Sequence, residues 1–140
     1  MLELFTGSFF SFQGSILGFE QYDEFEVILV NEGEPFLYLQ STEDLNIGFL
    51  VTTPFWLFKE YEFEIPDGNR RELGIQNEEE LAVFSIVTIR EPFSQSTVNL
   101  LAPLIVNIKT KRAKQIVLQA SSYNTQTLLF QGTISTEGGE

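Results

Sequence analysis

The sequence predicts an all-β fold, a single antiparallel barrel-like or sandwich domain in which helix is limited to short turns. Two observations favour this class: apolar and polar residues alternate in several stretches, and no stretch keeps a long period of 3.6 residues. Short connections rich in Gly, Pro, Asn and Asp separate these stretches, as in antiparallel sheets. We expect one domain over residues 1–132 and a frayed polar tail over residues 133–140, which lack an apolar face.

Two stretches, residues 24–30 and 59–65, predict half-buried strands. In each of them apolar side chains occupy one face and glutamates occupy the other, because successive side chains of a strand point to opposite faces. The second stretch places three like charges on its outer face: Glu60, Glu62 and Glu64. These charges repel one another and keep that face in water.

The remaining runs complete the expected sheet. Three of them predict strands buried on both faces: residues 35–40, 47–52 and 81–89. Residues 104–108 and 115–119 predict a hairpin, and the basic segment 109–114 between them guards an exposed turn. Short helical turns are expected at residues 18–22, 54–58 and 69–73.

The net charge is -12, and it is concentrated in one half of the chain. Residues 1–80 carry 17 acidic side chains against three basic ones, whereas residues 81–140 carry three against five. Such a field repels nucleic acids and anionic membranes and accelerates encounters with basic partners. The alternative interpretation is that the acid only keeps a Phe-rich domain soluble.

Cys and His are both absent, which excludes disulfides, zinc sites of the Cys/His type and histidine general bases. No apolar run is long enough to span a bilayer, and no basic residue precedes Lys59, so we expect a cytoplasmic protein. No cofactor motif is present, and the paired acids Glu43 and Asp44 lie in a predicted turn, where carboxylates are solvated. We therefore expect no enzyme, and a carboxylate-only hydrolase is the weakest alternative.

The densest acidic region is the candidate binding surface for a basic partner. Its members are Glu60, Glu62, Glu64, Asp67, Glu78, Glu79 and Glu80. A basic partner would relieve their mutual repulsion, whereas the alternative is a solvated outer face that deters edge-to-edge pairing. Nearby, Phe55 and Trp56 lie next to Pro54 and Phe58, and we favour a core cluster or a lid over an aromatic binding patch.

The C-terminal part contains Thr97-Val-Asn-Leu-Leu-Ala-Pro-Leu-Ile-Val-Asn107, followed by Lys111-Arg-Ala-Lys-Gln-Ile-Val-Leu118 and then Tyr123. This pattern resembles the signature of the FliW family of bacterial flagellar assembly factors. Earlier pieces agree in order with the family pattern, over about residues 14–123: Gly18-Phe-Glu20, Phe36, Leu39-Gln-Ser41, Phe49, Pro54 and Tyr61. The chain departs from the pattern at Leu17, where the family often has Pro, and at residues 124–127, which lack its basic character.

The most specific part of the resemblance consists of Asn99, Leu100 and Pro103, with Gln115 behind them. We expect structural roles for these residues. Asn99 can bond neighbouring backbone at a turn, and Pro103 can enter a strand where no N–H is required.

The resemblance also implies a function. FliW-like proteins bind the RNA-binding regulator CsrA and also bind flagellin, so that cytoplasmic flagellin occupies FliW and releases CsrA, which then represses translation of flagellin mRNA. The acidic surface defined above is the expected CsrA site, because CsrA must be basic to bind RNA. The alternative is an acidic adaptor or chaperone for another basic protein, and in neither case do we expect direct binding of nucleic acid or membrane.

Overall fold

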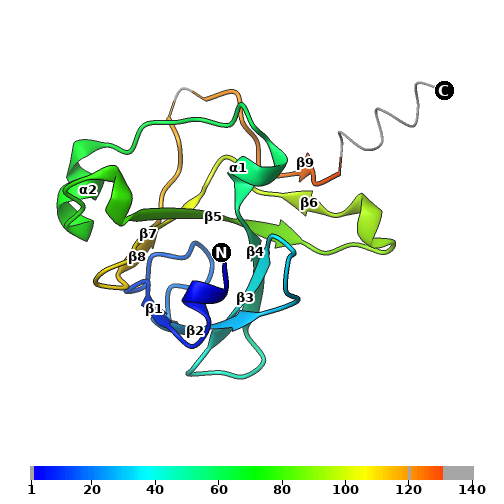
Figure 1. Cartoon of the computed structure of the whole chain (residues 1–140), viewed down its shortest axis with the longest axis horizontal. Coiled ribbons are helices and arrows are strands. Elements are labelled where there is room, and N and C mark those ends of the chain that lie inside the picture. The colour runs from blue at the N-terminus through cyan, green and yellow to red at the C-terminus, as the bar shows by residue number, and fades with distance from the viewer. Residues whose placement is uncertain (1, 120, 131–140) are drawn as a thin grey trace.

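A nine-stranded antiparallel sheet forms most of the computed structural model, which describes residues 2–119 and 121–130 (Figure 1). The tail expected over residues 133–140 lies outside the described residues. The strands are β1 (Phe9–Ser11), β2 (Glu24–Leu29), β3 (Phe36–Ser41), β4 (Gly48–Thr52), β5 (Leu81–Thr88), β6 (Thr97–Val98), β7 (Leu104–Asn107), β8 (Ala113–Gln115) and β9 (Thr127–Leu128). The predicted all-β class is confirmed.

Helix is confined to short pieces. The α-helices are α1 (Pro54–Leu57) and α2 (Asp67–Leu73), and the 3-10 helices are η1 (Leu2–Phe5), η2 (Glu78–Glu80) and η3 (Phe93–Gln95). Both α-helices confirm predicted helical turns, although α2 begins two residues earlier than expected. The turn predicted at residues 18–22 is not helical and consists of successive turns instead. No helix among the described residues is long and apolar enough to cross a bilayer.

The sheet is built around β5. Strands β1 to β4 follow one another as hairpins, and β4 then pairs with β5, whose other partners are β6 and β7. The far edge of the sheet curls back until Ser11 of β1 forms a single parallel bridge with Arg112, beside the β7–β8 hairpin. Because this single bridge is the only β-pairing between the two edges among the described residues, the sheet is barrel-like but not closed.

Phenylalanines supply much of the core. Phe10, Phe12, Phe25 and Phe84 are fully buried between the curled sheet and the N-terminal segment. Burial of each such ring stabilises the fold by about 1.5–3 kcal/mol. Two smaller clusters extend this core. One contains residues of β5 and β6 and the residue after β9, and the other lies between β7 and α2.

Most strand predictions are confirmed, with small shifts of their ends, at residues 24–30, 35–40, 47–52, 81–89 and 104–108. The C-terminal hairpin is also confirmed, but its second strand lies at Ala113–Gln115 and not at residues 115–119. The strand predicted at residues 59–65 is wrong, because this segment forms no ladder with any strand among the described residues.

Two lysines of the basic hairpin, Lys109 and Lys114, form ion pairs with acids of the same chain. Lys114 forms an ion pair with Glu72 at 2.7 Å, and the Arg112 guanidinium donates to the carbonyl of Glu72 at 2.5 Å. Cations near the C-terminal end of a helix interact favourably with its exposed carbonyls, so the hairpin is attached to the end of α2. The prediction of a basic segment that only guards a turn is thus incomplete.

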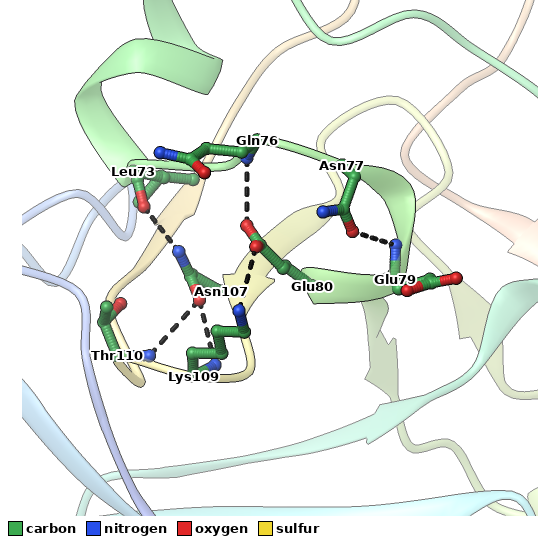
Figure 2. A network of polar contacts seen from close by, with 8 residues as sticks. All are labelled: Leu73, Gln76, Asn77, Glu79, Glu80, Asn107, Lys109 and Thr110. Atoms are coloured by element: carbon green, nitrogen blue, oxygen red, sulfur yellow. Dashed lines mark hydrogen bonds and ion pairs between the residues drawn. The ribbon is translucent and has the colours of Figure 1, made fainter.

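Asn107 ties the same hairpin to α2 from within (Figure 2). Its amide nitrogen donates to the Leu73 carbonyl at 2.8 Å, and its amide oxygen accepts from the backbone N–H groups of Lys109 at 2.9 Å and Thr110 at 3.2 Å. The side chain is 2% exposed, so water cannot replace these bonds.

Replacement of Asn107 by Ala should lower the free energy of unfolding by about 2 kcal/mol, because it leaves buried polar groups without partners. Urea unfolding followed by circular dichroism measures this change. The control is Asn31→Ala, since Asn31 is exposed and should change stability by no more than about 0.5 kcal/mol. Equal stabilities of the two variants would contradict the role of Asn107.

Candidate functional site

The acidic segment 59–65 is extended but lies outside the sheet. Burial alternates along it as the sequence predicts: Tyr61 is buried, Phe63 and Ile65 are half-buried, and the glutamates between them are exposed. Figure 1 shows this connection arching from α1 to α2 above β5 in the view. The predicted outer face of Glu60, Glu62 and Glu64 therefore exists, although no strand supports it.

Two tyrosines hold this segment in place. The Tyr61 hydroxyl donates to the Leu100 carbonyl at 2.7 Å, and the Tyr123 hydroxyl accepts from the backbone N–H of Glu62 at 3.0 Å. The two rings meet edge to face, with centroids 4.7 Å apart. Burial, and to a smaller degree the neighbouring Tyr123, raises the pKa of Tyr61, so its hydroxyl remains a proton donor at physiological pH.

The second group of predicted acids lies around α2 and η2. Asp67 opens α2 and is exposed, and Glu79 is exposed in η2. Glu78 is exposed as well but forms an ion pair with Arg70 of α2. The structure thus brings Asp67 and Glu78 to the same place as Glu62 and Glu64, since all four line one cavity.

Glu80 differs from the other predicted acids, because its residue is only 6% exposed. Its carboxylate accepts from the backbone N–H of Gln76 at 2.9 Å and pairs with Lys109 at 3.2 Å (Figure 2). The Gln76 N–H, followed by the Lys109 ammonium, lowers the pKa of Glu80. Glu80 is therefore a structural anchor of the β7–β8 hairpin, and its place in the predicted exposed surface is wrong.

The cavity that the four acids share has a volume of ≈ 770 Å³ and combines acidic and aromatic walls. Phe55 and Trp56 of α1 line it and are 44% and 54% exposed, respectively. The interpretation of these two residues as core is therefore wrong. We call this cavity the acidic groove.

The residues of the family-like signature do not lie in the acidic groove. The Asn99 side chain accepts from the backbone N–H groups of Leu101 at 3.1 Å and Ala102 at 3.0 Å, as predicted for a turn. Leu100 and Pro103 are buried, and Pro103 leads into β7.

Gln115 connects this turn to the N-terminal segment. Its side chain donates to the Ala102 carbonyl at 3.1 Å and accepts from the Leu17 N–H at 2.8 Å. Gln115 and Asn99 also line a second cavity of ≈ 500 Å³, which contains no charged side chain and has the exposed residues Leu17 and Val117 at its wall. We call it the apolar groove.

Two acids that do not line the acidic groove, Glu72 and Glu80, are poorly suited to act as general acids. A carboxylic general acid needs a raised pKa, whereas the pKa values of Glu72 and Glu80 are lowered, in Glu72 mainly by the Lys114 ammonium. Across residues 2–119 and 121–130, no three acidic side chains are grouped so that they could hold a metal ion. The acidic groove offers a partner negative charge and apolar surface together.

The lowered pKa of Glu80 predicts a pH dependence of stability. Because the folded pKa lies below the ordinary value of 4.5, the stabilisation is fully present above pH 4.5 and is lost as the pH falls through the folded pKa. The wild type should exceed Glu80→Gln in urea midpoint at about pH 7, and the difference should shrink towards about pH 3. The control Glu79→Gln, at an exposed position, should follow the wild type at both pH values. A difference that is constant with pH would contradict this role of Glu80.

Comparison with known proteins identifies the family. The family model described as FliW protein matches residues 2–129. The flagellar assembly factor FliW of Bacillus velezensis is 42% identical over 127 residues, which cover 91% of this chain and 89% of that protein. The flagellar assembly factor FliW of Bacillus subtilis is 44% identical over 115 residues, which cover 82% of this chain and 80% of that protein.

A solved structure agrees with these matches. The crystal structure of a flagellar assembly factor FliW superimposes with a TM-score of 0.81 and 32% sequence identity, covering 87% of this chain and 85% of that chain. The resemblance inferred from residues 14–123 is thereby confirmed, and it extends beyond them at both ends. This chain belongs to the FliW family.

Proposed function

We propose that this chain is a cytoplasmic partner switch in flagellar assembly, and not an enzyme. It binds the translational regulator CsrA and antagonises its RNA binding, and it also binds flagellin. Accumulated flagellin occupies the chain and releases CsrA, which represses translation of flagellin mRNA. Membership of a family whose similar members are named flagellar assembly factors supports the flagellar role.

The acidic groove is the observation that carries the proposal of a basic protein partner. Six of the seven predicted acids are exposed: Glu60, Glu62, Glu64, Asp67, Glu78 and Glu79. Exposed acids attract a basic surface, and the adjacent Phe55 and Trp56 supply apolar contact. An acidic protein docked beside an RNA-binding surface also repels RNA without filling the RNA site.

The same groove supports a second candidate function, an adaptor or chaperone for another basic protein. Charge and exposed aromatic rings are recognised by many basic surfaces, so they define the chemistry of the partner and not its identity. The two candidates differ in one observable property, which is whether purified CsrA alone is sufficient for tight binding.

Titration of the purified chain with CsrA by calorimetry should show tight binding that weakens as salt rises, because the contact is between opposite charges. Addition of flagellin should abolish the heat of CsrA binding. Linkage requires the reverse as well, so saturating CsrA should weaken flagellin binding by the same factor. Absence of heat with folded CsrA would favour the adaptor function.

Reversal of Glu60, Glu62 and Glu64 to Lys should weaken CsrA binding by at least about tenfold at low salt and flatten its salt dependence. The matched control reverses Glu32, Glu34 and Glu91, which are exposed, do not line the acidic groove and change the net charge by the same amount. Equal affinity of the two triple variants would remove the 59–65 segment from the interface.

A further inference from the structure

One edge of β5 is open over its first half. Val87 pairs with Leu50 of β4 and also with Val98 of β6, so β4 and β6 lie on opposite edges of β5. β4 ends at Thr52, opposite Ser85, and the chain then turns away into α1. On the β4 side, residues 81–84 therefore face no strand of residues 2–119 and 121–130.

Hydrogen bonding shows which main-chain groups point to this open edge. The carbonyls of Glu80 and Ile86 accept from Ile108 at 2.8 Å and from Asn99 at 2.9 Å, respectively, on the side of β6 and β7. Successive residues of a strand direct their N–H and C=O groups to opposite edges. Leu81 and Val83 consequently direct theirs towards the open edge.

Three of the main-chain groups of Leu81 and Val83 at this edge have no hydrogen-bond partner among the described residues. The Leu81 N–H donates to the Glu78 carbonyl, which leaves the Leu81 carbonyl and both the N–H and the carbonyl of Val83. Within the part of the chain that the structure describes, no hydrogen bond reaches these three groups. Unpaired strand edges are templates for pairing with another chain, and proteins usually cover them.

The acidic groove runs along this open edge. Its lining includes all of residues 81–84. One wall is η1, whose Phe5 ring lies 5.6 Å from the Phe84 ring on one face of β5. The other wall contains Phe63 and Ile65, which pack with the cluster around Val83 on the opposite face. The groove thus has a strand edge at its base and apolar walls on both faces.

We infer that the acidic groove binds an extended, basic segment of a protein partner by adding it as a strand to the open edge of β5. Main-chain bonds to Leu81 and Val83 hold such a segment, and its alternate side chains enter the two apolar walls. Four acids line the groove against one base: Glu62, Glu64, Asp67 and Glu78 against Arg70. This charge selects a basic occupant and disfavours an acidic one.

This inference rests on the proposed function and names the mode of binding, so CsrA is the probe. Amide hydrogen exchange of the labelled full chain, measured by NMR with and without saturating CsrA, tests it in the native sequence. The Val83 amide should exchange about tenfold or more slowly in the complex, because it gains a hydrogen bond. The amides of Ala82 and Phe84 point towards β7 and serve as internal controls with similar protection in both states.

Each other outcome of this experiment overturns the inference in a distinguishable way. Tight CsrA binding with unchanged Val83 exchange would reject strand addition and leave the proposed function intact. No CsrA binding would reject both. Protection of Val83 by flagellin but not by CsrA would reject the basic occupant.

A substitution in the groove wall gives an independent readout. Trp56→Ala should weaken CsrA binding by about 30-fold if the ring contacts the inserted segment, as buried interface tryptophans do. The control is Leu45→Ala, since Leu45 is 82% exposed and does not line the groove. Unchanged affinity of Trp56→Ala would reject the placement of the segment beside α1.

Discussion

The end of β4 at Thr52 determines where the acidic surface forms. Pro54 has no N–H and starts α1, so the chain cannot continue along β5. Residues 54–77 therefore lie outside the sheet, and part of this segment borders the first half of β5 across the acidic groove. A β4 four residues longer would pair with residues 81–84 and leave no groove there. The unpaired edge, the exposed rings of α1 and the row of glutamates all follow from this one departure.

Because the segment between α1 and η2 has no backbone ladder with the sheet, side-chain hydrogen bonds hold it in place. Tyr61 and Tyr123 fix the acidic segment through two hydrogen bonds, and Asn107 and Glu80 fix the region around α2. Three ion pairs join Arg70, Lys109 and Lys114 to Glu78, Glu80 and Glu72, respectively. Because the chain has 20 acidic and only 8 basic residues, many acids remain available to a ligand.

Most of the sheet could be predicted from sequence, because alternation of apolar and polar residues follows directly from burial on one face. Residues 24–30 and 59–65 show the limit of this inference, since the same alternation gave a paired strand in one case and an unpaired segment in the other. Alternation of apolar and polar residues indicates which side chains are buried. It does not show which groups the main chain is hydrogen-bonded to. The density of acidic residues likewise does not show which of their side chains point into the protein. Glu80 could therefore not be distinguished from its exposed neighbours Glu78 and Glu79.

Strand β5 lines both grooves, with residues 81–84 in the acidic groove and residues 86–88 in the apolar groove. Two partners could therefore oppose each other by competing for one groove or by coupling through β5. Coupling requires a second arrangement of β5 that both partners sense. Over Ser85–Val87 the strand is hydrogen-bonded to β4, and β6 borders its other edge from Ile86 onward, so a shift would break both ladders. If both proposed partners bind at β5, these ladders favour direct competition at the edge that is open among the described residues over coupling through the strand.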